Sequence, residues 1–235
     1  RQKYVMDFNY RVDGLSTNGP NSGFKKNPSI AVKWNIEKEK FMEDQEWLDY
    51  SSIRLSYGSN ITPNGNIYQA YGKYYGGAQY NNSNTVITDL KFLPNLYLEP
   101  TKATTYNAGF DIAVLNNRLS LSFDSYYKQN DNIFREKPIA SSNSFETIGS
   151  TEISNVNYGW EFQMTGRPLP TSSPFKWTMS GSFAINKEVL AALPDGLREQ
   201  IYYDSTYGQD IYYRLGINSL SNYLYNTKGV YATND

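Results

Sequence analysis

The chain has 235 residues, of which 39% are hydrophobic and 19% charged, and its 22 basic side chains nearly balance 23 acidic ones. That balance gives no electrostatic reason to expect nucleic acid as a partner. The lack of Cys and His excludes disulfides, thiol catalysis, zinc–thiolate sites and any catalytic set that needs an imidazole. We expect neither an enzyme nor a metal or cofactor site.

Seven segments of the chain alternate apolar and polar residues with period two, which is typical of β-strands. No apolar run approaches the roughly 18 residues of a membrane-spanning helix. In the first segment the apolar positions run from Tyr4 through Phe8 to Val12. The predicted strands lie near residues 3–12, 29–36, 52–57, 105–114, 118–128, 155–165 and 176–186.

Charge separates the two faces of these predicted strands. The apolar face of the seven segments carries no charged residue. The opposite face carries eleven: Lys3, Asp7, Arg11, Lys33, Arg54, Asp111, Arg118, Asp124, Lys128, Glu161 and Lys176. A charge facing lipid at the middle of a bilayer costs about 2–4 kcal/mol, so a face that excludes charge indicates contact with lipid.

The connections alternate between short and long. The short ones, 37–51, 115–117 and 166–175, are predicted periplasmic turns, and the long ones, 13–28, 58–104, 129–154 and 187–235, are predicted extracellular loops. This asymmetry is typical of outer-membrane barrels. Both ends of the chain are expected to lie inside a longer protein.

These patterns predict an all-β fold, a partial transmembrane antiparallel β-barrel of about seven strands in a bacterial outer membrane. A soluble β-sandwich, such as a secreted adhesin or carbohydrate-binding module, also alternates. However, five of the segments have 10–12 residues, whereas ordinary strands have about 5–6. Six aromatic residues are expected to face lipid: Tyr10, Trp34, Phe110, Tyr127, Trp160 and Trp177.

Two groups of tyrosines in the predicted loops are candidates for contact with a ligand or a lid protein. Tyrosine is enriched in such contacts because its ring stacks and its hydroxyl forms hydrogen bonds. Packing within the loops is the alternative explanation. The first group is Tyr68, Tyr71, Tyr74, Tyr75 and Tyr80, and the second is Tyr202, Tyr203, Tyr207, Tyr212 and Tyr213.

Several phrases, in order along the chain, resemble the SusC/RagA-like family of TonB-dependent outer-membrane transporters. They are Pro28–Ile36 with Glu39–Met42 and Trp47-Leu48, Ile53–Gly58 with Asn64–Ile67, Leu98–Thr101 with Tyr106–Asp111, Leu115–Leu119 with Asp124–Tyr127, Val156–Glu161, Phe175–Trp177 with Phe183–Lys187, and Tyr213–Gly216 with Gly229–Tyr231. The chain departs from the family phrases at Ile61–Pro63 and at Ile217–Leu220.

The resemblance implies one sector of a barrel of about 22 strands, with the plug domain and the last strands outside this chain. It implies active import of oligosaccharides or peptides. The implied partners are a SusD-like surface lipoprotein, TonB through a part of the protein not present here, outer-membrane lipid, and in some assemblies other outer-membrane proteins. The departures keep an alternative open, a SusC-like barrel serving as a structural scaffold in a larger outer-membrane complex.

Overall fold

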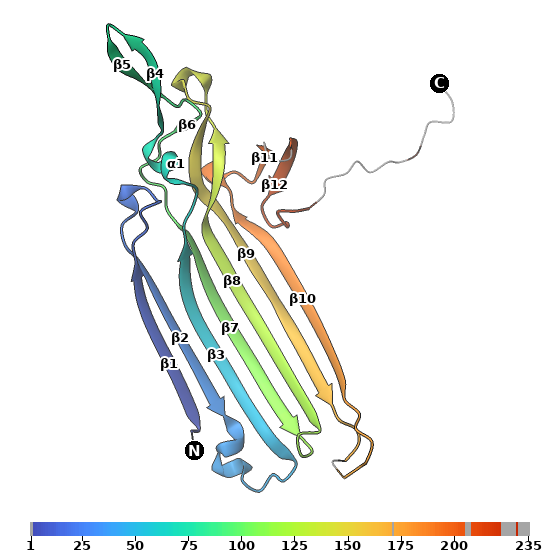
Figure 1. Cartoon of the computed structure of the whole chain (residues 1–235). Helices are drawn as coiled ribbons and strands as arrows, with labels where there is room; N and C mark the ends of the chain where they lie inside the picture. Colours follow the sequence, from blue (N-terminus) through green and yellow to red (C-terminus); the bar gives the residue numbers. More distant parts are fainter. Residues whose placement is uncertain (1, 171, 205–207, 222–228, 230–235) are drawn as a thin grey trace.

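A computed structural model describes residues 2–170, 172–204, 208–221 and 229 of the chain. Its main feature is a sheet of seven long antiparallel strands in the order β1-β2-β3-β7-β8-β9-β10, to which the short strand β6 adds by parallel pairing with β9 (Figure 1). The strands are Tyr4–Asp13 (β1), Lys25–Asn35 (β2), Leu48–Thr62 (β3), Phe92–Leu93 (β6), Thr101–Val114 (β7), Leu119–Pro138 (β8), Thr147–Gly166 (β9) and Met179–Ala192 (β10).

The long strands form a meander in which each pairs with the next long strand along the chain. Among the described residues β1 pairs only with β2 and β10 only with β9, so the sheet is open. No helix within the described ranges is both long enough and apolar enough to cross a membrane. The predicted all-β, partial-barrel fold is confirmed.

The strand register brings the apolar positions of all seven strands onto one face. Phe110 on β7 lies opposite Ile53 on β3 and opposite Phe123 on β8. Phe123 lies opposite Phe162 on β9, which in turn lies opposite Phe183 on β10. Because side chains alternate along a strand, one aligned row fixes the face of all the others. We call this the outward face and its reverse the inward face.

Several strands extend beyond the predicted segments toward the end of the sheet that carries the long connections, which we call the loop end. β3 covers residues 48–62 rather than 52–57, and β8 and β9 pair as far as Pro138 and Thr147, inside the predicted loop 129–154. A register shift near Asn132, whose φ is +59°, separates the alternating part of β8 from this extension. Beyond that bulge neither face keeps the period-two pattern, although backbone pairing continues.

The opposite end of the sheet, which we call the turn end, carries compact connections. Leu115, Asn116 and Asn117 join β7 to β8 with φ values of 58–59°, a left-handed conformation that Asn tolerates better than most residues. Two 3₁₀ turns, Ile36–Lys38 (η2) and Lys40–Met42 (η3), join β2 to β3.

The loop end contains more regular structure than the sequence predicts (Figure 1). The predicted loop 58–104 holds the helix Ile67–Tyr71 (α1), capped by Asn66, and a hairpin of Tyr74–Tyr80 (β4) and Ser83–Thr88 (β5) that extends away from the sheet. The remaining elements are the 3₁₀ turns Pro20–Ser22 (η1), Ser141–Asn143 (η4) and Pro194–Gly196 (η5) and the hairpin Glu199–Asp204 (β11) with Gln209–Arg214 (β12).

Few large apolar side chains are buried, and most large apolar side chains of the outward face are exposed. A small core at the loop end unites Ile153, Leu190 and Leu193 with Tyr213 from β12. By contrast Phe8, in the middle of β1, is 64% exposed. Exposed apolar faces of this extent mark a surface that contacts lipid or another protein.

Candidate functional site

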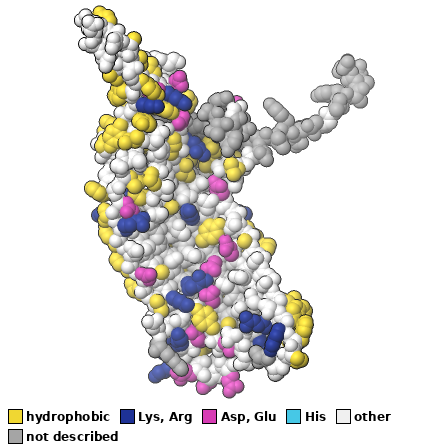
Figure 2. All heavy atoms as spheres, in the orientation of Figure 1, with side chains coloured by type: hydrophobic (Ala, Val, Ile, Leu, Met, Phe, Trp, Pro, Cys, Tyr) yellow, Lys and Arg dark blue, Asp and Glu magenta, His cyan; other side chains and the backbone are white. Residues whose placement is uncertain are grey.

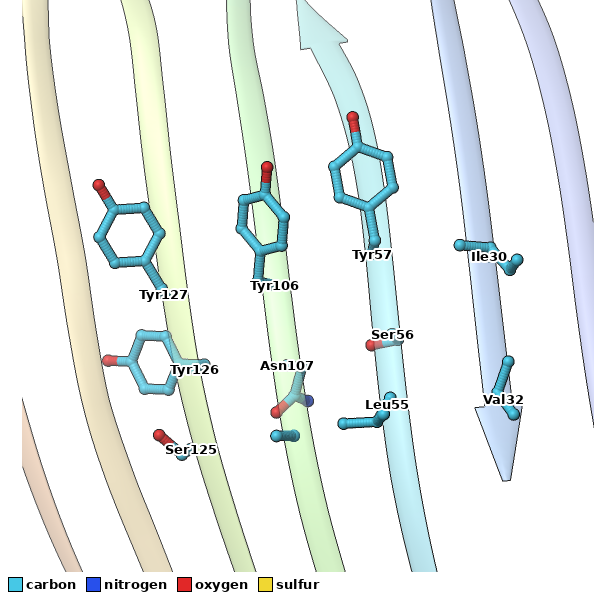
Figure 3. A pocket seen from close by; sticks show the side chains of 11 residues that line it. Ile30, Val32, Leu55, Ser56, Tyr57, Tyr106, Asn107, Ser125, Tyr126 and Tyr127 are labelled. Atoms are coloured by element: carbon cyan, nitrogen blue, oxygen red, sulfur yellow. The ribbon is translucent and has the colours of Figure 1, made fainter. Parts of the chain in front are cut away.

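The outward face is a continuous apolar surface with a shallow groove. Tyr57, Tyr106 and Tyr127 lie side by side on β3, β7 and β8, with ring centroids 5.1 and 6.3 Å apart, and their hydroxyls point toward the loop end (Figure 3). The small residues Ala108 and Ser125 open a groove of about 460 Å³ next to these rings. Tyrosines with hydroxyls aligned toward one end are typical of the aromatic girdle at a membrane–water interface.

The inward face carries an ion network across three strands. The Arg54 guanidinium on β3 donates from Nε and Nη2 to the two carboxylate oxygens of Asp111 on β7, at 2.8 and 3.1 Å. Nη2 also donates to Asp124 on β8, at 3.1 Å. Ser52 and Ser122 donate to the Asp111 carboxylate as well. Figure 2 shows acidic and basic side chains interspersed among uncharged polar groups over this face.

Arg54 on β3 can contact Asp124 on β8 because the position between them on β7 is Gly109. Gly109 lies opposite both Arg54 and Asp124 in the register. A Cβ at this position would lie 2.5 Å from Oδ1 of Asp124 and 2.8 Å from Nη2 of Arg54. Any side chain on Gly109 therefore displaces the guanidinium, so the glycine and the network belong together.

Asparagines tie the loops to one another at the base of the loop end. The Asn64 amide donates to the backbone carbonyls of Glu99 and Asn132, at 2.7 and 2.5 Å, and accepts from Thr101 Oγ1 at 2.6 Å. Asn18, which is 1% exposed, donates to the Leu98 carbonyl. These bonds satisfy backbone groups that strand pairing leaves open.

One part of the first tyrosine group converges on a lysine. Lys73 lies 5.3 Å from the Tyr68 ring centroid and 4.7 Å from that of Tyr75. The Tyr75 hydroxyl donates to Asp89 at 2.9 Å. The hydrogen bond with Tyr75 raises the pKa of Lys73, and the Lys91 backbone N–H followed by the Tyr75 hydroxyl lowers that of Asp89. Tyr68 and Tyr75 thus help to orient the hairpin base.

The other tyrosines of the first group are dispersed. Tyr71 ends α1 and is exposed, whereas Tyr74 and Tyr80 lie at opposite ends of β4, with 63% and 79% of their surface exposed. Val86 and Ile87 on β5, which lie opposite Gly76 and Tyr75, are also exposed. The hairpin therefore presents apolar and aromatic surface, and it stays a candidate contact surface.

The second tyrosine group splits. Tyr213 is 5% exposed and packs in the small core, and its hydroxyl accepts a hydrogen bond from Arg135 at 3.3 Å. The Tyr212 hydroxyl donates to Glu199 across the hairpin. Tyr202 and Tyr203 belong to β11, but their side chains, like the whole of Tyr207, lie outside the described residues.

The predicted lipid-facing residues occupy the outward face of their strands, with one exception. Tyr10, Phe110, Tyr127 and Trp160 are exposed there. Trp34 stacks on Tyr4, and its indole N–H donates to Glu39 at 3.1 Å, a contact that ties the turn end of the sheet to η2 and η3. Trp177 precedes β10 by two residues and lies in the turn.

The alternation in the sequence places the inward charges one by one and does not indicate which of them form pairs. Arg54, Asp111 and Asp124 each alternate correctly, but only the register shows that they meet. No sequence motif marks Lys73 as the contact of Tyr68 and Tyr75. The Asn81-Asn82 pair was a readable signal for the β4–β5 hairpin, because both residues have positive φ, as a two-residue hairpin turn requires.

An open antiparallel sheet whose outward face is apolar and free of charge in its central part, and whose inward face carries ion pairs, has the pattern of a transmembrane β-barrel wall. The comparison with family models agrees: residues 3–234 match the model described as "TonB dependent receptor-like, beta-barrel". The chain belongs to this family of TonB-dependent receptor barrels.

Curated relatives carry the same family name. TonB-dependent receptor P3 of Formosa agariphila is 32% identical over 244 residues, which cover 97% of this chain and 23% of that protein. TonB-dependent receptor SusC of Bacteroides thetaiotaomicron is 30% identical over 220 residues, covering 86% and 21%. The chain thus spans about a fifth of the length of the relatives it matches.

Solved structures show the same fold. The RagAB peptide transporter superposes with a TM-score of 0.77 at 19% identity, over 92% of this chain and 23% of the other. The open-open state of the RagAB peptide importer gives a TM-score of 0.80 at 19% identity, with the same coverage. The likeness to SusC and to RagAB structures confirms the SusC/RagA-type resemblance found in the sequence.

Proposed function

We propose that this chain is one sector of the wall, with its extracellular loops, of an outer-membrane transporter that imports oligosaccharides or peptides with energy from TonB. One observation carries the proposal: the register joins, across seven strands, an outward face whose central part is free of charge and an inward face that carries charged side chains. A soluble binding module has no physical need for a broad outward face without charge. A hydrated import pathway needs a polar and charged inward face. The names of the relatives support the hypothesis of transport, because these proteins are called receptors and transporters rather than enzymes.

The partners follow as part of the same proposal. A SusD-like surface lipoprotein covers the loop end, TonB acts through a segment outside this chain, and the outward face contacts outer-membrane lipid. The β4–β5 hairpin is the proposed contact with the lipoprotein or with bound ligand, because Tyr74, Tyr80 and Val86 expose apolar surface far from the sheet. Such aromatic surface is typical of interface anchors.

Uptake by cells that carry the full-length gene tests transport. Deletion is expected to abolish import of either a labelled oligosaccharide series or a labelled peptide pool, and the class that is lost identifies the substrate. Unchanged uptake of every candidate, together with co-purification of other outer-membrane proteins, would instead support the scaffold alternative. An intact TonB-binding segment upstream favours transport, and its absence favours the scaffold.

Variants of the hairpin test the contact surface. Replacing Tyr74 and Tyr80 by alanine in the full-length protein is expected to weaken capture of the lipoprotein or uptake of substrate, while barrel assembly stays normal. Tyr97→Ala is a matched control. Tyr97 lies at the loop end but outside the hairpin, and its exposed fraction of 71% falls between the 63% of Tyr74 and the 79% of Tyr80. Equal behaviour of both variants contradicts the proposed role of the hairpin.

A further inference from the structure

A second groove lies on the sheet at the turn end and has no role in the proposed transport. It has a volume of about 540 Å³, and its apolar lining includes Leu119 on β8, Met164 on β9 and Met179 on β10. All three side chains belong to the outward face. The groove is therefore continuous with the surface that contacts lipid.

Two glycines make this depression. Gly166 lies opposite Leu119 and Met179, and Gly181 lies opposite Met164, so each glycine sits on the outward face among larger side chains. A Cβ at either position would meet no atom within 4 Å. The space is open and lined with flexible apolar side chains, which suits a hydrocarbon chain.

Cations gather where the groove reaches the turns. Arg118 and Lys176, which the alternation assigns to the inward face, precede the first residues of β8 and β10, so they lie in the turns, where strand alternation does not fix their side. Arg118 and Arg167 line both this groove and an adjoining hollow of about 300 Å³, which Lys176 and Trp177 also line. No Asp or Glu of the described residues lines either space. At the neighbouring turn, Asp49 on β3 accepts the Asn117 backbone N–H at 2.8 Å.

The two arginines differ in how firmly they are held. The Arg118 guanidinium donates from Nε to the Arg167 carbonyl at 3.1 Å and from Nη2 to the Pro168 carbonyl, which fixes its plane and leaves Nη1 as a further donor. The Arg167 side chain is exposed beside it. A fixed guanidinium next to an adaptable one forms a fork for a phosphate oxygen pair.

We propose that this surface binds an anionic glycerophospholipid, with its phosphate between Arg118, Arg167 and Lys176 and one acyl chain along the groove past Gly181. The inference rests on the proposed membrane orientation, in which the turns face the periplasmic leaflet. Cations at the head of an apolar groove complement an anionic headgroup joined to a hydrocarbon tail. Trp177 lines the adjoining hollow, and indole rings are enriched at the membrane–water interface.

Native mass spectrometry of the full-length protein tests the site, with phosphatidylglycerol or phosphatidylethanolamine added to the detergent-solubilised protein. The wild type is expected to retain phosphatidylglycerol in preference. The double variant Arg167→Gln/Lys176→Gln is expected to lower the retained fraction roughly tenfold, and Gly181→Leu, which fills the groove without touching a cation, to lower it comparably. Lys102→Gln, an exposed cation on β7 at the other end of the sheet, is expected to change nothing.

Other outcomes overturn the proposal. Equal retention by the wild type and the double variant shows that the cations do not bind the lipid. Loss with the double variant but not with Gly181→Leu, or full displacement by free glycerol 3-phosphate, shows a simple anion site without an acyl groove. The measurement is independent of uptake, so a failed transport assay with preserved, Arg167-dependent lipid binding refutes transport alone.

Discussion

The wall and the loop end of this molecule are stabilised in different ways. The wall consists of regular backbone ladders whose side chains only need to be apolar on one face and polar on the other. The loop end depends on individual bonds, such as Asn64 to Glu99 and Asn132, or Asn95 to the Gly149 carbonyl at 2.8 Å. The wall therefore tolerates many substitutions within a polarity class, whereas single changes at the loop end have specific effects.

A charge on the outward face is expected to produce the largest effect. Phe183 lies between Trp177 and Lys187, in the middle of the outward stretch of β10, so Phe183→Arg in the full-length protein should cost about 2–4 kcal/mol of folding free energy. Ser182→Arg, one residue away on the inward face, is the matched control. Unfolding titrations in lipid vesicles measure both, and equal losses would show that the two faces are not distinguished by lipid.

A glycine substitution tests the specificity of the loop end. A Cβ on Gly19 would lie 2.1 Å from the Leu96 carbonyl oxygen, a backbone atom that cannot move aside alone. Gly19→Ala should therefore destabilise the contact between the first loop and residues 96–98 by roughly 1–3 kcal/mol. Hydrogen exchange in both segments measures this opening.

Gly76→Ala is the control for that experiment, because a Cβ there meets nothing within 4 Å and the backbone has no positive φ. It should leave hydrogen exchange in both segments unchanged. Faster exchange in the Gly76→Ala variant than in the Gly19→Ala variant would contradict the close contact at Leu96.

The Arg54 network should contribute less, because it lies on a hydrated face where ion pairs are screened. Arg54→Gln is expected to cost about 1 kcal/mol, within the range measured for partly exposed pairs. A double-mutant cycle with Asp111→Asn isolates the coupling between the two side chains. Additive losses in the cycle would mean that the observed bidentate contact contributes nothing to stability.

Acid should produce the smallest effect, confined to the hairpin base. The Lys91 backbone N–H and the Tyr75 hydroxyl hold the pKa of Asp89 below its ordinary value of 3.8. Because the folded pKa is depressed, the contribution of the carboxylate is complete above the ordinary value and is lost as the pH falls through the folded pKa. The protection factors of residues 72–90, which correct hydrogen exchange for its intrinsic pH dependence, should fall over that interval, and Asp89→Asn should remove this change in protection.

The wall was predictable because its constraint is local. Each outward residue, from Phe8 to Phe183, is expected to meet the same apolar surroundings in the proposed membrane, so alternation appears in every segment independently and antiparallel pairing of neighbours follows. The ends of the strands were not predictable, since above the bulge at Asn132 the backbone still pairs while neither face is uniform.

The loop end was harder because its partners are remote in sequence. Asn18 meets Leu98 and Asn64 meets Asn132, and no local pattern marks such pairs. Tyr213 shows the same limit: among many loop tyrosines, only its contact with Ile153 and Leu190 distinguishes a core residue from a surface one. The number of tyrosines in the loops indicates a surface rich in aromatic residues, but it does not show which of these rings are exposed and which are buried.

The Arg54 network has a consequence for assembly. Period-two alternation rejects any strand slip by an odd number of residues, because every side chain would change face. It does not reject a slip by two, which keeps apolar residues outward and moves one strand by about 7 Å along its neighbour. Such a slip carries Asp124 out of reach of Arg54, so the three charges, with Gly109 leaving room between them, select one register among the few that keep the apolar residues outward.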